Sequence, residues 1–598
     1  MGVISKVRRE VRTAYVLSRT KHAMERVHPG GKDTVADLFE SRVDEHPDAA
    51  AVHWAGNEYS YAEVDSAANR LANWALDQGL ERGDVVALMM RNRPEYLFSW
   101  LGLAKIGVEI ALINTHLTGA PLAHALSAAD PKALIIGSES GKNFATARHD
   151  LDAGVPAYSM GARVGGCELL DPEFLEAPDA RPPSSVRAGM CSGDNLFYIY
   201  TSGTTGDPKA AKYSHYRFLQ TGYAYSCLAK ITANDRIYCV LPLYHSAGGV
   251  IAVSMALLNG ASLVLEDRFS AGGFWSDCRE RGVTVFQYVG ELCRYLLAVP
   301  ENAYDRRHQV RCAIGNGLRS DIWERFQHRF GIGQITEFYS ATEGNFSLVN
   351  IDNKVGAVGR VPPYLRKRFA VELIKYDHEE GEPARGDDGF CRRCGCDEPG
   401  EAIGRIGDDA DGAGRFEGYK DENENEARIM RDVFEPGDAW YRSGDLLSRD
   451  DEGYFYFIDR VGDTFRWKGH DVSTGEVAEA LLSFGGILEA NVYGVPVVGC
   501  EGRAGMSAVV LNGRFDASAL YDHVSGVLPD SSRPLFIRIR REIEKTGTFK
   551  YRKVDRVSEG FDPDAISEPL YFRDDSTRSY VSLDRSLFER IVGGDVRL

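Results

Sequence analysis

A run of ten residues rich in glycine and hydroxyl groups has the composition of a phosphate-binding turn. It reads Tyr200-Thr201-Ser202-Gly203-Thr204-Thr205-Gly206-Asp207-Pro208-Lys209 and follows an apolar stretch. The glycines allow tight turns that point backbone N–H groups at an anion, the hydroxyl groups add donors, and Lys209 adds positive charge. The common nucleotide P-loop needs Gly-x4-Gly-Lys-Ser/Thr, and here Pro208 stands five residues after Gly203. We therefore expect a phosphate-binding loop of another kind.

This run closely resembles the phosphate-binding loop of the adenylate-forming superfamily, which includes acyl-CoA synthetases, peptide-synthetase adenylation domains and luciferases. Further motifs of the superfamily occur in the same order along the chain. The resemblance implies that ATP phosphates are bound by Thr201, Ser202, Gly203, Thr204, Thr205, Gly206 and Lys209.

The stretch Glu337-Phe338-Tyr339-Ser340-Ala341-Thr342-Glu343 resembles the adenine and metal motif of this superfamily. The resemblance implies that Phe338 and Tyr339 lie at the adenine, with Tyr339 stacked on it, and that Thr342 contacts the α-phosphate. It also implies that Glu343 holds Mg²⁺, which agrees with the preference of this cation for hard oxygen ligands beside phosphates. Ser340 replaces the usual glycine. Taken alone, the stretch would read more readily as a strand end with an exposed carboxylate.

Two shorter motifs complete the expected nucleotide site. Ala313–Arg319 resembles the loop against which adenine lies, which assigns Gly315, Asn316 and Gly317 to AMP binding. Tyr441-Arg442-Ser443-Gly444-Asp445 resembles the motif whose aspartate binds the ribose hydroxyl groups, and a carboxylate is a natural acceptor for them. The pattern continues with Asp459-Arg460, so Arg460 is expected on the ribose as well.

The motifs beyond Arg460 imply a moving C-terminal part. Gly462 and Asp463 fall where the superfamily has its hinge, and a glycine eases rotation. Trp467-Lys468-Gly469-His470-Asp471 resembles the loop that lines the pantetheine passage, which assigns Lys468, Gly469 and His470 to it, although most relatives carry Glu-Asn in place of His470-Asp471. Lys545-Thr546-Gly547-Thr548-Phe549-Lys550 resembles the motif that supplies the adenylation lysine, here Lys550.

The acyl side of the site is less specific. Leu241–His245 resembles the segment beside the acyl carboxylate, which assigns Tyr244 and His245 to the acyl pocket. His245 reads equally as a core histidine with satisfied hydrogen bonds. The nearly continuous apolar run Val250–Leu258 fits either the wall of an acyl tunnel or a buried core helix.

Three longer phrases, Tyr288–Tyr295, Gly315–Arg319 and Gly462–Gly469, look like the fatty acid transport protein, or very-long-chain acyl-CoA synthetase, branch. This resemblance implies a long- or very-long-chain fatty acid–CoA ligase that forms an acyl-adenylate with ATP and Mg²⁺ and then a thioester with coenzyme A. An acyl-AMP ligase that serves a carrier protein shares the first step and remains an alternative. A membrane-associated fatty acid uptake protein with vestigial chemistry is a third reading, which the retained Glu343, Asp445, Arg460 and Lys550 disfavour.

These motifs need a scaffold of parallel strands, because ligands bind at the carboxyl ends of such strands. Short apolar runs alternate with helical patterns between residues 33 and 343, which predicts an α/β fold with mostly parallel sheets flanked by helices. The expected strands are Val85–Met90, Glu109–Asn114, Ala133–Gly137, Leu196–Tyr200, Arg236–Leu243, Ser262–Leu265, Val283–Val289 and Val310–Ile314. The expected helices include Tyr61–Gln78, Pro94–Ile106, Gly272–Arg281 and Ser320–Phe330.

The rest of the chain predicts a small β-structure and a second α/β unit. Residues 376–430 are rich in Gly, Asp, Glu and Pro and read as loops between short strands. After the strand Gly453–Ile458, Ser473 with Glu476 forms a capping-box pattern that begins a helix. We therefore expect an N-terminal segment 1–28, an adenylation domain 29–460, a hinge 461–463 and a mobile C-terminal domain 464–598.

Composition limits the remaining possibilities. The 598 residues carry a net charge of −17, which disfavours nucleic-acid binding, and no apolar run approaches the ~20 residues of a membrane span. With no recognisable signal peptide and 11 cysteines without framework spacing, a reducing, cytoplasmic setting is expected. Cys391, Cys394 and Cys396 with His378 fit either a zinc site or a surface loop with reduced thiols. The sequence indicates no oligomeric state.

Residues 1–28 form a basic segment on this acidic chain. Its positive side chains outnumber Glu10 and Glu25, and Val3, Val7, Val11 and Tyr15 recur near helical spacing. Such a helix fits peripheral contact with the inner, anionic face of a membrane, and it fits equally a solvated helix packed on the protein body.

Overall fold

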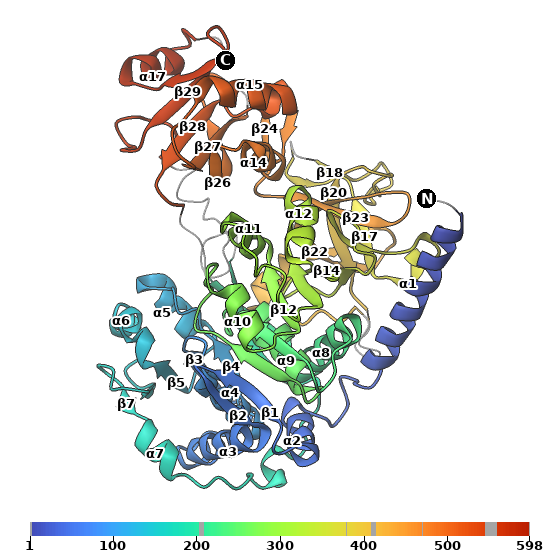
Figure 1. Cartoon of the computed structure of the whole chain (residues 1–598), viewed down its shortest axis with the longest axis vertical. Coiled ribbons are helices and arrows are strands. Elements are labelled where there is room, and N and C mark those ends of the chain that lie inside the picture. The colour runs from blue at the N-terminus through green and yellow to red at the C-terminus, as the bar shows by residue number, and fades with distance from the viewer. Residues whose placement is uncertain are drawn as a thin grey trace. The chain divides into compact units, whose positions relative to one another are not determined.

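The computed structural model describes residues 3–202, 208–377, 380–407, 414–468, 470–500, 502–543, 559–596 and 598. The chain divides into two compact units (Figure 1). Unit 1 comprises Met1–Ala370, Gly404–Arg431 and Asp438–Tyr441, and unit 2 comprises Val371–Ile403, Asp432–Gly437 and Arg442–Leu598. The expected domain limits and the hinge at 461–463 stay predictions.

The first sheet of unit 1 has seven strands in the order β7-β6-β5-β3-β4-β8-β9. All neighbours pair in parallel except the antiparallel pair β8 and β9. Every residue of β3 and β5 is buried, as expected where helices cover both faces of a parallel sheet. The strands are β3 (Val85–Met89), β4 (Glu109–Leu112), β5 (Ala133–Gly137), β6 (Ala157–Met160), β7 (Glu168–Leu169), β8 (Asn195–Ser202) and β9 (Pro208–Ser214).

The second sheet of unit 1 has eight strands in the order β15-β14-β13-β12-β10-β11-β1-β2. Its inner neighbours pair in parallel, and an antiparallel strand closes each end. The strands are β1 (Ala50–Trp54), β2 (Asn57–Ser60), β10 (Arg236–Cys239), β11 (Ser262–Leu265), β12 (Val285–Val289), β13 (Cys312–Asn316), β14 (Gln334–Ser340) and β15 (Ser347–Asn350). The predicted α/β class with mostly parallel sheets is confirmed.

One hydrophobic cluster joins residues of both sheets to the helices α3 (Tyr61–Asp77), α4 (Pro94–Lys105), α8 (His215–Ala229) and α9 (Val253–Leu257). Local signals fix two of these helices. Ser60 and Glu63 form a capping box at the start of α3, and Pro94 occupies the first turn of α4, where its missing N–H costs nothing. A Cβ atom on Gly102 would lie 2.5 Å from the carbonyl oxygen of Ala68, so this glycine lets α4 approach α3 closely.

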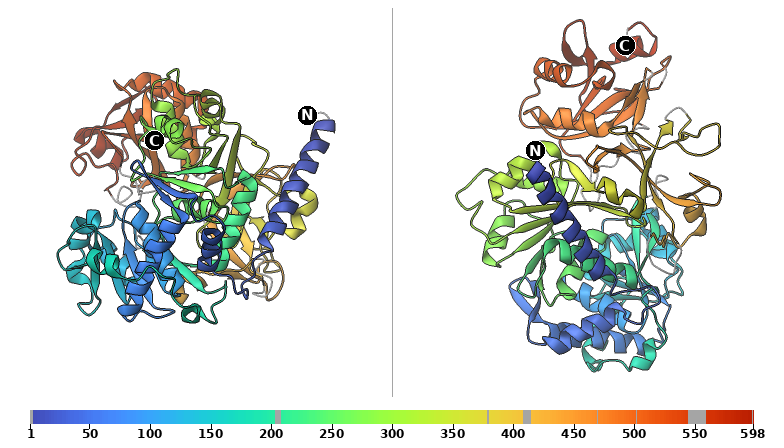
Figure 2. Two further views of the ribbon diagram at one scale, coloured as in Figure 1. Left: turned by 60° about the horizontal axis from the view of Figure 1, so that its bottom comes forward. Right: turned by 90° about the vertical axis from the view of Figure 1, so that its right-hand side faces the viewer.

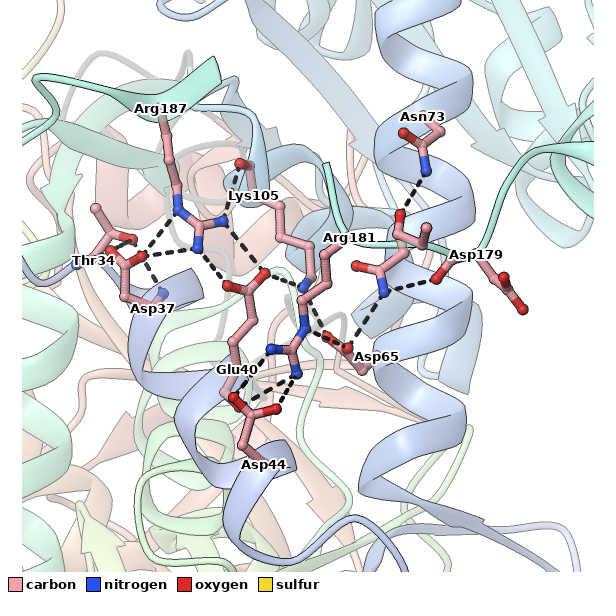
Figure 3. A network of polar contacts seen from close by, with 12 residues as sticks. Thr34, Asp37, Glu40, Asp44, Asp65, Asn73, Lys105, Asp179, Arg181 and Arg187 are labelled. Carbon is pink, nitrogen blue, oxygen red and sulfur yellow. Dashed lines mark hydrogen bonds and ion pairs between the residues drawn. The ribbon is translucent and has the colours of Figure 1, made fainter. Parts of the chain in front are cut away.

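A buried ionic network ties the first helices together (Figure 3). The ammonium group of Lys105, whose side chain is fully buried, donates to Glu40 of α2 (Val35–Glu45) at 2.5 Å and to Asp65 of α3 at 2.7 Å. Arg187 pairs with the same Glu40, and Arg181 donates to the same Asp65 at 3.0 Å. Because buried charges need such partners, the network fixes α2, α3 and α4 in one arrangement.

The predicted strand Arg236–Leu243 is wrong in its second half, because β10 ends at Cys239. The side chain of buried Asn92 donates to the carbonyl oxygen of Leu241 at 2.9 Å and accepts from the N–H of Leu243 at 2.8 Å. These hydrogen bonds, together with Pro242, which has no N–H, replace the pairing that a continued strand would need. The other predicted strands and helices are present with small differences at their ends.

Helix α1 (Val3–Met24) packs along α8 on the outside of unit 1 (Figure 2). Its Glu10 accepts hydrogen bonds from Arg360 at 2.6 Å and Tyr364 at 3.1 Å, and buried Thr13 lies 3.5 Å from Asp352. Residues 1–28 therefore include a helix packed on the body. None of the helices in the described residues combines the length and apolar character that a bilayer-crossing segment needs.

The described residues of unit 2 contribute to two larger sheets and contain two two-stranded ones, β18 (Tyr376–Asp377) with β19 (Glu382–Pro383) and β24 (Phe465–Trp467) with β25 (His470–Val472). Part of the first larger sheet has the order β23-β22-β20-β17, and the second larger sheet has the order β26-β27-β28-β29-β30. The first set is β17 (Val371–Ile374), β20 (Gly400–Arg405), β22 (Ala439–Arg449) and β23 (Tyr454–Arg460). The second set is β26 (Ile487–Pro496), β27 (Arg503–Leu511), β28 (Phe536–Arg540), β29 (Leu570–Asp574) and β30 (Ser579–Ser582), packed with α14 (Thr474–Ser483) and α15 (Ala517–Val527). Ser473 caps α14 through the N–H of Glu476, as predicted.

Candidate active site

The glycine-rich run lies at the junction of β8 and β9. Thr201 at the end of β8 pairs with Lys209 near the start of β9, so both lie in the antiparallel pair at the edge of the first sheet. Gly203, Thr204, Thr205 and Gly206 lie outside the described residues, and so does the side chain of Ser202. The ammonium group of Lys209 forms an ion pair with Glu424 of α13 (Glu422–Glu426). Any phosphate that binds Lys209 must therefore compete with this carboxylate.

The residues assigned to the α-phosphate and the metal follow β14 in a tight loop. Arg217 of α8 donates from one nitrogen to the carbonyl oxygens of Ala341, at 3.1 Å, and Gly344, at 2.5 Å. These two carbonyl groups flank Thr342 and Glu343, so the guanidinium group fixes the loop that carries both. The hydroxyl group of Thr342 also lies 3.3 Å from that of Ser246.

Glu343 is a buried carboxylate, 7% exposed, in polar and aromatic surroundings. The hydroxyl group of Tyr441 donates to its Oε1 at 3.3 Å. Burial, and after it the negative charge of Glu343, raise the pKa of Tyr419. Burial lowers the pKa of Arg428, but this effect is outweighed by the neighbouring groups of Tyr441, Tyr419 and Glu343, which raise the pKa. A carboxylate and a guanidinium group therefore act on the same small region, which suits a metal ion and a phosphate bound together.

The two aromatic residues assigned to adenine face opposite sides of β14. Phe338 is buried in the core, with its ring centroid 4.8 Å from that of Tyr225 on α8. Tyr339 lies on the other face, with its ring 5.8 Å from that of Phe346. Gly315, Asn316 and Gly317 form the end of β13 and the turn after it, and Gly317 has a φ of +81°. Tyr339 is also buried, at 9% exposed, but on the face of β14 opposite the ring of Tyr225.

The acyl-side segment leads into a π-helix, η4 (Ser246–Ala252), which continues as α9. A Cβ atom on Gly249 would lie 1.9 Å from the carbonyl oxygen of Leu243, so the glycine is needed for this close packing. His245 precedes the π-helix, and burial raises the pKa of Tyr244. Single π-turns are rare and concentrate at functional sites. The run Val250–Leu258 is buried in the core cluster.

The two residues assigned to the ribose lie in unit 2. Asp445 on β22 is in register with Arg460 on β23, and Oδ1 of the aspartate lies 3.7 Å from Nε of the arginine. Gly462 and Asp463, which are assigned to the hinge, follow in a turn, where the N–H of Asp463 donates to the carbonyl oxygen of Arg460 at 3.0 Å. Strand pairing thus brings together two residues that the sequence placed far apart.

The residues assigned to the thiol passage form a hairpin of β24 (Phe465–Trp467) and β25 (His470–Val472). Lys468 sits at its tip with a φ of +50°, and His470 is exposed. Gly469 and Lys550 lie outside the described residues.

The cysteine cluster shows no metal geometry in the part of the chain that the structure describes. Cys391 and Cys394 are buried, Cys396 is exposed, and no group of three metal-binding side chains is found among the described residues. His378 lies outside them.

Sequence reasoning missed several residues at this site: Arg217, Ser246, Glu337, Arg428 and Tyr441 as a partner of Glu343. Tyr441 opens a motif that was recognised for its aspartate, so its position was a usable signal. Glu337 likewise opens the motif Glu337–Glu343. Arg217, Ser246 and Arg428 act through contacts between distant segments, and their local sequence carries no signal.

Two family profiles match the chain. The profile described as AMP-binding enzyme matches residues 39–389, and that described as AMP-binding enzyme C-terminal domain matches residues 476–550. Among curated proteins, the mouse long-chain fatty acid transport protein 6 is 41% identical over 573 residues, which cover 94% of this chain and 91% of that protein. The rat long-chain fatty acid transport protein 1 is 40% identical over 604 residues, covering 100% of this chain and 93% of that protein.

Solved structures share the fold. An anthranilate CoA ligase in complex with anthranoyl-AMP has a TM-score of 0.72 at 20% identity, covering 88% of this chain and 97% of that chain. A benzoate CoA ligase from Burkholderia xenovorans LB400 has a TM-score of 0.72 at 22% identity, covering 88% of this chain and 98% of that chain.

Proposed function

Because the chain belongs to the AMP-binding enzyme family, in the branch of the long-chain fatty acid transport proteins, we propose that it activates a long- or very-long-chain fatty acid with ATP and transfers the acyl group to coenzyme A. The observation that carries the proposal is the end of β14 and the loop after it: Tyr339 lies on the strand, and Thr342 and the buried carboxylate of Glu343 lie in the loop. The substrate class rests on the similarity to fatty acid transport proteins along nearly the whole chain.

In the first step a carboxylate oxygen attacks the α-phosphorus of ATP, pyrophosphate leaves and the acyl-adenylate forms. Two anions must meet, so neutralising and positioning charge is the main task of the protein. Thr342 donates to the α-phosphate, Tyr339 stacks on adenine, and Lys209 and Lys550 supply positive charge. Glu343 is the residue that would hold Mg²⁺, and its buried, hydroxyl-bonded carboxylate fits a hard cation. When bound, Mg²⁺ supplies positive charge beside the phosphates.

In the second step the thiolate of coenzyme A attacks the carbonyl carbon of the adenylate and AMP leaves. Different protein groups must then surround the same carbonyl. Rotation at Gly462 and Asp463 would remove Lys550 and present the hairpin of Lys468, Gly469 and His470.

The proposal is tested by measuring AMP release and thioester formation with purified protein, ATP, Mg²⁺ and coenzyme A. Long- and very-long-chain fatty acids are expected to give a kcat/KM at least about 10-fold above that of bile or aryl acids. A parallel reaction with a phosphopantetheinylated carrier protein in place of coenzyme A separates the ligase from an acyl-AMP ligase. Turnover of aryl acids alone, or acyl transfer only to the carrier, would contradict the assignment.

We also propose that helix α1 attaches the protein to the inner, anionic face of a membrane. Its body-facing side includes Thr13, Val16 and Leu17, whereas Ile4, Val7, Val11 and Tyr15 are 57–76% exposed. At 100° per residue these four side chains lie within one narrow stripe opposite the packed side. Exposed Arg8, Arg12 and Arg19 line one edge of this stripe. An apolar stripe beside arginines complements a bilayer with anionic headgroups.

Replacing Ile4, Val7, Val11 and Tyr15 together by serine is expected to lower binding to vesicles of 30% phosphatidylserine by at least about 10-fold in a sedimentation assay. The matched control replaces Leu175 and Val527, exposed apolar residues elsewhere, by serine. Vesicles of phosphatidylcholine alone should bind the unaltered protein weakly. Equal partitioning of both variants onto the anionic vesicles would rule out α1 as the contact.

A further inference from the structure

Glu337 on β14 is a carboxyl group that the motif assignments leave without a role. It is 1% exposed and stands two residues before Tyr339 on the same strand. Strand register aligns it across the sheet with Gly315 of β13 and Tyr288 of β12. Parallel neighbours in register point to the same face, so Glu337 and Tyr288 lie on either side of a position that has no side chain.

Gly315 is what lets the two side chains meet. Oε2 of Glu337 forms a hydrogen bond with the hydroxyl group of Tyr288 above the glycine. A Cβ atom on Gly315 would lie 2.7 Å from Cγ of Tyr288 and 2.1 Å from its carbonyl oxygen. Any larger residue at this position would therefore separate the carboxyl group from the tyrosine.

The same carboxyl group reaches the turn that is predicted to lie against adenine. Its Oε1 accepts hydrogen bonds from the N–H of Gly317 and, at 3.2 Å, from the N–H of Leu318. Gly290, at the start of α11 (Gly290–Ala298), closes the turn from outside, because a Cβ atom there would lie 1.6 Å from the carbonyl oxygen of Gly317. The turn is thus held between one carboxyl group and one glycine.

We propose that Glu337 is a positioning residue for ATP: its carboxyl group fixes the Gly315–Leu318 turn in the shape that receives the adenine ring. The proposal rests on the proposed function, since the adenine assignment of this turn does. Without the carboxyl group, two backbone N–H groups would lose their acceptor and Gly317 would be free to leave its left-handed conformation.

The protonation state of Glu337 follows from its surroundings. Burial raises its pKa to about 8, against the lowering effects of the hydrogen bonds from Tyr288, Gly317 and Leu318. The thiol groups of Cys293 and Cys312 also interact with the pair of Glu337 and Tyr288, and the carboxylate of Glu291 acts on Cys293. Burial raises the pKa values of both thiol groups. The carboxyl group is therefore mostly neutral at pH 7; in that form Oε1 still accepts from the turn, while a proton on Oε2 reverses the bond with Tyr288, whose hydroxyl group then accepts.

A neutral carboxyl group makes Glu337→Gln a close substitute, because the amide oxygen accepts and the amide nitrogen donates in the same places. At pH 7 this variant is expected to keep the KM for ATP within about 2-fold of the wild type. Glu337→Leu removes both functions and is expected to raise the KM and the dissociation constant for ATP by about 10-fold. The KM values for fatty acid and coenzyme A, and kcat at saturating ATP, should change much less.

A pH profile separates this role from a merely structural one. Above pH 8 the ionised carboxylate still accepts from the turn, but its negative charge beside the proposed ATP site repels the triphosphate, so the wild type should lose ATP affinity, whereas Glu337→Gln should not. The linkage to stability has a defined window: a carboxyl pKa raised from 4.5 to about 8 stabilises the folded state fully below pH 4.5, and this contribution is lost progressively as pH rises from 4.5 through about 8. The difference between wild type and Glu337→Gln in thermal unfolding therefore changes over that range.

The measurements are steady-state kinetics and equilibrium dialysis with labelled ATP, which needs no turnover. The proposal would be overturned if Glu337→Leu left the dissociation constant for ATP unchanged. It would also be overturned if Glu337→Gln lost as much ATP affinity as Glu337→Leu at every pH. If Glu337→Leu does not fold, the comparison of Glu337→Gln with wild type across pH decides the question. Wild type that binds ATP but activates no acid would instead contradict the proposed function.

Discussion

Lys550→Ala is expected to lower the rate of acyl-adenylate formation by about 10³-fold and to leave thioester formation from supplied acyl-adenylate nearly unchanged. The reason is that the two steps place different charges at the same carbonyl group. In the first step two anions approach each other, so a cation between the carboxylate and the α-phosphate lowers the barrier. In the second step the acid is already activated and needs no such cation.

The two half-reactions are measured separately, by pyrophosphate release with ATP and fatty acid, and by thioester formation from synthetic acyl-AMP and coenzyme A. Lys553→Ala, three residues further along the sequence, is the matched control and should retain both activities. An equal loss in both half-reactions would show that Lys550 is not the adenylation lysine.

Glu343→Gln is expected to lower kcat/KM for adenylation by about 10²–10³-fold, because the isosteric amide is a neutral and weaker ligand for Mg²⁺. The loop should keep its shape, since the amide oxygen can still accept from Tyr441 and Arg217 still holds Ala341 and Gly344. The variant should therefore need a higher Mg²⁺ concentration for half-maximal rate, which a titration of the metal measures.

Tyr441→Phe is the control for this prediction. It removes the hydroxyl group that bonds Glu343 but leaves the carboxylate, so a drop of only about 10-fold or less is expected. If the phenylalanine variant lost as much activity as Glu343→Gln, or if Glu343→Gln kept the Mg²⁺ dependence of the wild type, Glu343 would not be the metal ligand.

The sequence could predict the features that depend on residues close together in the chain. Apolar runs of strand length predicted β3, β5 and β11 closely, because strands buried on both faces consist of little else. The capping signal at Ser473 likewise predicted the start of α14. Motif resemblance assigned roles to Tyr339, Thr342 and Glu343, which lie close together in the sequence. The structure places this segment at the end of β14 and in the loop that follows.

Contacts between distant segments could not be predicted. Asn92, which ends β10 early, lies about 150 residues before the strand that it interrupts. The bond between Glu337 and Tyr288 depends on the register of three strands and on the absence of a side chain at Gly315. For α1, periodicity predicted an amphipathic helix, but only packing reveals that Thr13 faces the body and Val11 faces outward.

The exchange of labelled pyrophosphate into ATP tests the central claim most directly, because it requires reversible formation of an acyl-adenylate and nothing beyond it. With purified protein, Mg²⁺ and a long-chain fatty acid, label is expected to enter ATP without coenzyme A, and to do so only when the acid is present. No exchange with any fatty, bile or aryl acid would contradict the account.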